Sequence, residues 1–256
     1  MSIEPSSRWR VLLCGLFPLF FVGPLAAQFA PPAGRAGSTA LFRDSSAVVG
    51  WAAGEAESAT GPADGFSVVS LGDGGTATCT FERPITDGPG PDFAVFENGF
   101  QDTFLELAFV EVSSDGVRFV RFPATSLTDT TTQVGAFGTL DATKLDNLAG
   151  KYRANWATPF DLAQLRDSAG LDVTRVTHVR LRDVVGSVDP AYATRDAAGR
   201  PVNDPWPTPF PTGGFDLDAV GVLHFITPTA AGAPVATTTT ARLYPNPVRA
   251  GGTLYA

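Results

Sequence analysis

Short apolar segments separated by turn-forming residues are the feature that most constrains this chain. From Leu41 to Ile226, apolar and β-branched runs alternate with clusters of Gly, Pro, Asp and Asn. Their spacing of about 8 to 12 residues is typical of a β-sandwich or barrel. No repeat of about 20 to 50 residues is visible, which argues against a propeller or solenoid. We therefore predict one all-β domain over residues 41–226, a jelly-roll-type antiparallel β-sandwich with long decorated loops and one short helix.

The clearest local prediction is a hairpin over Val110–Phe122. Ser113–Gly116 would form its turn, because Gly116 can adopt the positive φ that a tight turn requires. The predicted strands cover residues 47–52, 65–70, 76–81, 93–96, 105–113, 118–122, 177–184 and 219–225. The short helix is predicted over residues 158–165, with Thr158 as its N-cap and Pro159 as its first residue.

Residues 1–27 have the pattern of an export signal. Arg8 and Arg10 precede an apolar run from Val11 to Leu25, and Ala26-Ala27 provides a small-residue cleavage site. The run is shorter than the about 20 residues of a membrane-spanning helix and contains two prolines, so we predict no transmembrane segment. Residues 28–40 would then lead into the domain.

Composition limits the partners. The net charge is −8 and the only lysines are Lys144 and Lys151, so the chain has no basic stripe for nucleic acid or anionic lipid. Cys14 lies in the export signal; its surroundings loosely resemble a lipoprotein box, although Leu13 stands where a small residue is expected. Removal of the signal would leave Cys79 alone, which excludes an internal disulfide.

The C-terminal residues predict a second targeting device. Residues 227–241 are small, uncharged and rich in Thr, Ala and Pro, as in a solvated linker. The stretch Leu243-Tyr244-Pro245-Asn246-Pro247 resembles the opening of the C-terminal sorting domain of the type IX secretion system. That domain normally continues for several tens of residues, so we expect 242–256 to be an incomplete start of it. The resemblance implies that the type IX machinery carries the protein to the cell surface or exterior; the alternative is a Pro-rich turn.

A wider resemblance covers the domain. The hairpin is similar to one found in discoidin-type and other carbohydrate-binding jelly rolls. Together with residues 87–100, 148–165 and 213–222, it resembles a group of bacterial cell-surface proteins that have a signal peptide, one β-sandwich and a C-terminal sorting signal. Some of that group are associated with cobalamin uptake across the outer membrane. The resemblance implies surface capture of a ligand, with a corrinoid as one candidate.

Oxygen-bearing side chains stand at several predicted strand ends. They are Asp92, Glu97, Asn98, Asp183, Asp216 and Asp218. Ca²⁺ takes about six to eight oxygen ligands, and Asp216 and Asp218 would share a face of an extended segment. We predict Ca²⁺ as the candidate cofactor of these residues. The alternative is that Asp216 caps a turn and Glu97 pairs with Arg180 or Arg182.

Aromatic residues in two long connections form the second candidate site. Tyr152 and Trp156 lie in residues 139–160, and Trp206 and Phe210 lie among the prolines of residues 195–222. Loops of this length are usually functional or disordered, and their aromatic content favours order. The rings are suited to stacking on a sugar or another flat ligand. The alternative is that they only fix the loops onto the sheet.

Catalysis is not indicated by any motif. A glycosidase needs two carboxylates, and Glu97, Glu106 and Glu111 are candidates, but nothing in the sequence singles out a pair. His178 and His224 lack metal-ligand spacing. We therefore expect a secreted or cell-surface, non-catalytic binding protein, with a glycan as the first candidate ligand and a corrinoid as the second. The alternatives are a secreted glycoside hydrolase and a structural or adhesive surface protein.

Overall fold

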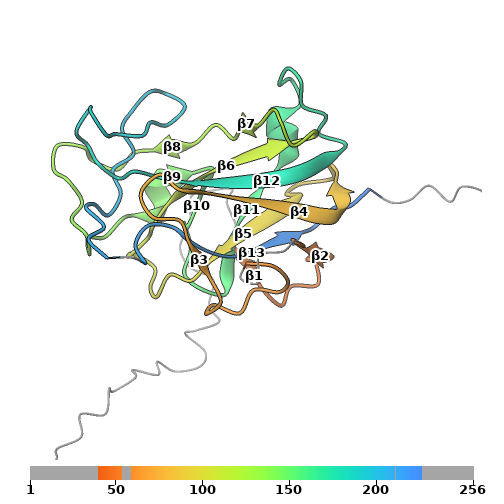
Figure 1. Ribbon diagram of the computed structural model, residues 1–256, viewed down its shortest axis with the longest axis horizontal. Coiled ribbons are helices and arrows are strands. Elements are labelled where there is room, and N and C mark those ends of the chain that lie inside the picture. The colour runs from red at the N-terminus through yellow and green to blue at the C-terminus, as the bar shows by residue number, and fades with distance from the viewer. Residues whose placement is uncertain (1–39, 54–58, 211, 227–256) are drawn as a thin grey trace, which may run out of the picture.

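The computed structural model describes residues 40–53, 59–210 and 212–226, and the regular secondary structure of this part of the chain is almost wholly β (Figure 1). The strands are β1 (Leu41–Phe42), β2 (Gly50–Trp51), β3 (Val69–Ser70), β4 (Thr76–Ile85), β5 (Phe93–Glu97), β6 (Ala108–Ser113), β7 (Val120–Arg121), β8 (Thr125–Ser126), β9 (Leu145–Asp146), β10 (Leu148–Ala149), β11 (Trp156–Phe160), β12 (Val176–Asp183) and β13 (Asp216–Val222). The helical elements of these residues are two short 3₁₀ turns, η1 (Ala142–Lys144) and η2 (Leu162–Leu165).

The predicted export signal, linker and sorting motif all lie outside the described residues. Within the described ranges, a search for helices with the length and hydrophobicity needed to cross a bilayer found none.

Two antiparallel sheets form a sandwich, which confirms the predicted fold class. One sheet has the order β1-β11-β5-β13-β2, with β3 also paired to β13. The other has the order β10-β6-β12-β4, with β7 paired to β6, and β8 and β9 form a separate ribbon. The long strands β4, β5, β6, β11, β12 and β13 alternate between the two sheets along the chain. Figure 1 shows β4, β6 and β12 side by side in the upper part of the molecule.

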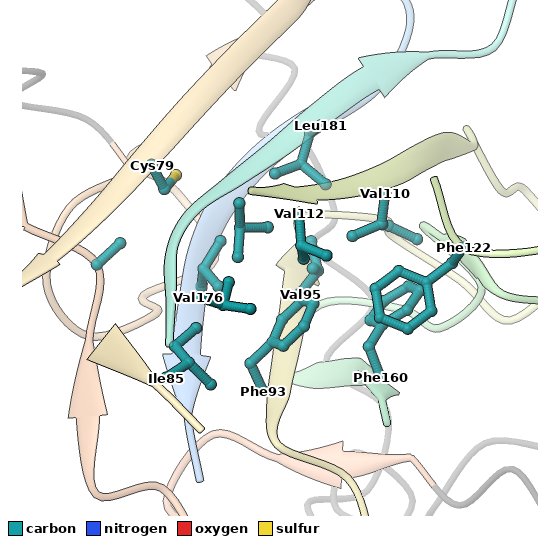
Figure 2. Close-up of a cluster of buried hydrophobic side chains, with 14 of the residues drawn as sticks. Cys79, Ile85, Phe93, Val95, Val110, Val112, Phe122, Phe160, Val176 and Leu181 are labelled. Atoms are coloured by element: carbon teal, nitrogen blue, oxygen red, sulfur yellow. The ribbon is translucent and has the colours of Figure 1, made fainter. Parts of the chain in front are cut away.

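The main core lies between the sheets. Phe93 and Val95 of β5 point into the same apolar cluster as Val110 and Val112 of β6, as Figure 2 shows. Phe96, on the opposite face of β5, belongs to a second cluster on the outside of that sheet. Alternate side chains of a strand point to opposite faces, so covering both faces buries every residue of β5.

The predicted hairpin is confirmed. Val112 pairs with Val120 across β6 and β7. Asp115 orders the turn, because its Oδ1 accepts hydrogen bonds from the backbone N–H groups of Val117 (2.8 Å) and Arg118 (2.9 Å). Gly116 has the expected positive φ of 74°.

The predicted helix begins later than expected, and Thr158 is not its N-cap. Residues Trp156–Phe160 instead form β11, in which Thr158 pairs with Val95. Asp161 is the cap, accepting a hydrogen bond from the backbone N–H of Ala163 at 2.8 Å, and only η2 follows. Pro159 is tolerated in the strand because it lies beyond the two residues of β11 that β1 covers, so its missing N–H leaves no bond unmade.

Candidate binding site

Several strand ends meet at one end of the sandwich, and most of them carry a carboxyl group. Glu97 ends β5 beside Leu217, and Asp216 begins β13 opposite Ser70. In the other sheet, Asp183 ends β12 opposite Ala108. The two sheets are joined here by a hydrogen bond of 2.8 Å from the backbone N–H of Phe215 to Asp183 Oδ1. Antiparallel register therefore gathers carboxyl groups that are far apart in the sequence.

A cavity of about 500 Å³ opens at this end. Its lining residues are Val68, Ser70, Glu97, Asn98, Gly99, Phe100, Gln101, Phe104, Glu106, Phe137, Phe210, Thr212 and Asp216. They come from β3 and the residue before it, the end of β5, the β5–β6 connection, the β8–η1 connection, the β12–β13 connection and the start of β13. Figure 1 shows the long connections that follow β8 and β12 gathered at the left-hand end of the sandwich.

Phenylalanine rings form the apolar part of the cavity. Phe137 stacks on Phe210 with ring centroids 5.6 Å apart, and on Phe104 with centroids 6.4 Å apart. Phe100 and Phe137 are 84% and 77% exposed. Large rings so open to water are uncommon for side chains with only a packing role, and adjacent exposed rings mark contact surfaces.

Carboxyl groups form the polar part, and all of them have raised pKa values. Burial raises the pKa of Glu97 well above its usual value, and the nearby Glu106, Asp216 and Asp218 raise it further. Burial and the charges of Asp216 and Asp183 raise the pKa of Glu106 to about 7. Burial also raises the pKa of Asp216, although Ser70 and Asn98 oppose this through hydrogen bonds.

The carboxyl groups of the cavity differ in how they are held. Glu97 Oε2 accepts a hydrogen bond of 2.7 Å from the backbone N–H of Gly99, and Glu106 Oε1 accepts one of 3.0 Å from that of Gly214. Asp216 is only 9% exposed, yet its Oδ1 is buried without a hydrogen-bond partner. A buried polar atom without a partner costs about 1–3 kcal/mol, so Asp216 Oδ1 is an unsatisfied acceptor in a residue that lines the cavity.

More buried carboxyl groups lie behind the cavity and hold its loops. Asp204 Oδ2 accepts a hydrogen bond of 3.1 Å from the backbone N–H of Leu107, and burial followed by the charges of Asp183, Glu106 and Glu97 raises its pKa well above its usual value. Burial raises the pKa of Asp183 to about 7. None of the described residues that line the cavity is Lys, Arg or His. The site is therefore rich in carboxyl groups, and no positive charge among the described lining residues stabilises their ionised form.

The residues predicted as metal ligands separate into different places. Glu97, Asn98 and Asp216 line the cavity. A bulge between Leu217 and Ala219 interrupts the register of β13 at Asp218, whose carboxylate accepts hydrogen bonds from the backbone N–H groups of Asp64 (3.1 Å) and Gly65 (3.0 Å). The carboxylate of Asp183 instead accepts hydrogen bonds from the backbone N–H groups of Gly74 and Phe215, which lie in two different loops.

Asp92 lies at the opposite end of β5 from Glu97, a separation of about 17 Å at the usual rise of a strand. It belongs to a second acidic group, in which ligand atoms of Asp87, Asp92 and Asp161 lie within 4.8 Å of one another. Both oxygens of Asp92 already accept hydrogen bonds, Oδ1 from Gly88 and His224 and Oδ2 from Leu162. Asp87 forms an ion pair with Arg166 at 2.5 Å, which brings a positive charge to this group.

The predicted ligand-contact residues also separate. Tyr152 and Trp156 are buried in a small apolar cluster, where Trp156 packs on Phe42 with ring centroids 5.0 Å apart. Trp206 stacks on Tyr192 with centroids 6.4 Å apart, outside the lining of the cavity. Phe210 alone of these residues lines the cavity, beside Phe137.

Sequence reasoning missed much of the aromatic wall. Phe100, Phe104 and Phe137 occur singly in polar loops, and no local pattern marks them. Glu106 was only one of three catalytic candidates, and Glu111 is elsewhere, bound by Arg121 (2.8 Å) and Arg180 (2.6 Å). Arg180, one of the two arginines that the alternative interpretation paired with Glu97, is thus paired with Glu111 instead.

Comparison of the chain with protein-family models, with curated proteins and with solved structures gave no match.

Proposed function

We propose that this is a non-catalytic ligand-binding protein and that the cavity between Glu97, Glu106, Asp216 and the phenylalanine wall binds a glycan. One observation carries the proposal: exposed ring faces and buried hydrogen-bond acceptors line the same cavity. A sugar ring has apolar C–H faces that stack on aromatic rings and hydroxyl groups that donate to carboxylates. Pockets that hold such ligands combine apolar walls with a few fixed polar groups.

The acceptors are held before any ligand arrives. Backbone N–H groups of Gly99 and Gly214 fix the carboxyl groups of Glu97 and Glu106. Gly99 leaves room for this arrangement, since a Cβ there would stand 2.7 Å from Glu97 Oε2. Side chains fixed in this way lose little conformational entropy on binding, which favours affinity.

The proposal includes display at the cell surface, which the export signal and the resemblance to a type IX sorting signal support. A corrinoid is the second candidate ligand, because the exposed faces of Phe100 and Phe137 would also suit a flat macrocycle. Ca²⁺ is the candidate cofactor, with the cavity carboxyl groups and the group of Asp87, Asp92 and Asp161 as its two candidate sites.

Calorimetric titration of the purified full chain tests these ligands. The probes are neutral and charged oligosaccharides, cobalamin, and Ca²⁺ with EDTA as the reference. We expect an oligosaccharide to bind and Phe137→Ala to weaken its binding about tenfold, the loss of roughly 1.4 kcal/mol of stacking and buried area. Tyr192→Ala, an exposed ring outside the cavity lining, should leave binding unchanged. If no oligosaccharide binds, or if both variants behave alike, the glycan proposal is wrong.

A glycoside hydrolase is the second candidate function, because Glu97 and Glu106 lie in one cavity and the pKa of Glu106 is raised to about 7. A general acid in a glycosidase needs such a raised pKa, so that it is protonated near neutral pH. Incubation of the protein with the oligosaccharides that bind would reveal cleavage. Turnover that Glu106→Gln abolishes while binding persists would favour the hydrolase over the binding protein.

A further inference from the structure

We infer that the ligand of the cavity is positively charged, specifically a glycan with free amino groups. This inference rests on the proposed glycan function and adds the charge of the ligand to it. Glu97, Glu106 and Asp216 all line the cavity, and Asp216 Oδ1 is buried there without a hydrogen-bond partner. No Lys, Arg or His is among the described lining residues.

A cation would interact favourably with both the carboxyl groups and the aromatic rings of the cavity. An ammonium group donates hydrogen bonds to carboxylates, and it is attracted to the face of an aromatic ring within about 6 Å. Elsewhere in the described chain this attraction is used within the protein, for example where Arg180 lies 3.8 Å from the ring centroid of Phe119. The rings of Phe100, Phe104, Phe137 and Phe210 line the cavity, so an ammonium group bound there would lie close to aromatic faces.

The spread of the carboxyl groups favours an organic cation over a single metal ion. The acidic side chains that come within 4.8 Å of one another as a group of three are Asp87, Asp92 and Asp161, at the other end of β5. Among the described residues, no three of the cavity carboxyl groups come that close together, and the cavity that they line has a volume of about 500 Å³. An amino sugar fits this arrangement, because it has several donors around an apolar ring and brings its own positive charge.

The test compares two oligosaccharides that differ only in charge. The tetramer of glucosamine and the tetramer of N-acetylglucosamine are titrated into the full chain at about pH 7, where the glucosamine amino groups and the carboxyl group of Glu106 are both partly charged. Tetramethylammonium chloride is the third probe, since it has the charge without the sugar. We expect the glucosamine tetramer to bind at least tenfold more tightly than its acetylated counterpart, with an advantage that falls as salt rises.

Matched variants locate the effect. Asp216→Asn and Glu106→Gln each remove one charge at nearly constant volume, and either should remove most of the preference for the amino tetramer. Glu82→Gln makes the same chemical change at an exposed position of β4 and should leave the preference intact. Urea unfolding of each variant shows whether it is folded. Two cavity variants are used, so that failure of one to fold still leaves the other to decide.

The outcomes separate this inference from the proposed function. Equal or tighter binding of the acetylated tetramer would overturn the cationic inference and uphold glycan binding. Binding of tetramethylammonium without either tetramer would support the charge of the ligand and overturn the glycan. Binding of none of the three probes would overturn the inference, and binding of neutral oligosaccharides alone would do the same while the proposed function stands.

Discussion

Replacement of Glu106 by Gln should stabilise the protein at alkaline pH and leave its stability nearly unchanged at acidic pH. The pKa of Glu106 is raised from its usual value of 4.5 to about 7 in the folded chain, because burial and the charge of Asp216 disfavour the ionised form. An acid whose pKa rises on folding contributes stability below its unfolded value, and this contribution is lost as pH rises through its folded value. Gln cannot ionise, so the variant does not suffer that loss.

The magnitude follows from the size of the pKa change. Each pH unit between 4.5 and about 7 is worth about 1.4 kcal/mol, which gives about 3 kcal/mol in favour of the variant well above pH 7. Glu106 is only 9% exposed, so screening by water reduces this figure little. The hydrogen bond of 3.0 Å from the backbone N–H of Gly214 is kept, because the Gln carbonyl accepts it as the carboxyl does.

Urea unfolding of the wild type and Glu106→Gln, at a series of pH values from about 4 to 9 and without ligand, measures the difference. The two free energies of unfolding should agree near pH 4, diverge between about pH 4.5 and 7, and differ by a constant amount at higher pH. A variant that is less stable by the same amount at every pH would refute the reasoning. It would show that a compensating charge already neutralises Glu106. The stabilised variant should also bind the proposed cationic ligand more weakly, the trade-off expected of a site that stores electrostatic strain for function.

Three further perturbations test other parts of the structure, each by urea unfolding. Phe93→Ala removes a fully buried ring that stacks on Phe160 with centroids 5.4 Å apart, and should lower the free energy of unfolding by about 3–5 kcal/mol. Phe100→Ala removes an exposed ring and should change that free energy by less than about 0.5 kcal/mol. Similar effects from both variants would contradict the assigned core. Asp92→Ala leaves the backbone N–H groups of Gly88 and Leu162 without acceptors, and should lower the free energy of unfolding by about 1–3 kcal/mol per group. Ligand binding in the distant cavity should persist in this variant. Lost binding would show that the two ends of β5 are coupled. Burial alone would raise the pKa of Glu111, but hydrogen bonds from two arginines bring this pKa below its usual value, so the ionised side chain stabilises the fold at neutral pH and this stabilisation is lost as pH falls through the lowered pKa. Glu111→Gln should therefore destabilise the protein at pH 7, opposite in sign to Glu106→Gln. A stabilised Glu111→Gln would contradict the ion pairs.

The fold class could be read from the sequence because its signals are local. Short apolar and β-branched runs between turn-forming residues identified most long strands, and Ser113–Gly116 identified a turn whose hydrogen bonds are local. The short strands β1 and β8 to β10 were not predicted. Two-residue strands carry almost no periodic signal, and they form only because the tertiary structure brings a partner strand alongside: β11 for β1, β6 for β10, and each other for β8 and β9.

The helix prediction failed in part for the same reason. Thr158 and Pro159 form a good helix start when considered alone. In the folded chain, the pairing of Thr158 with Val95 outweighs that preference, and Asp161 caps the single turn that follows. Local propensity is worth about 1 kcal/mol or less per residue, which one set of sheet pairings easily exceeds.

The sequence by itself determined the composition of the site but not its assembly. It identified Glu97, Asn98 and Asp216 as strand-end oxygens and Phe210 as a loop aromatic, and all four line the cavity. It could not separate Asp92 from Glu97, because which end of a strand meets which loop depends on the order and register of strands in two sheets. Phe137 joined Phe210 for the same reason: residues more than seventy apart in the sequence come together only when both loops leave the same end of the sandwich. Inter-sheet packing fixes that arrangement, and it depends on contacts among distant side chains that no local spacing encodes.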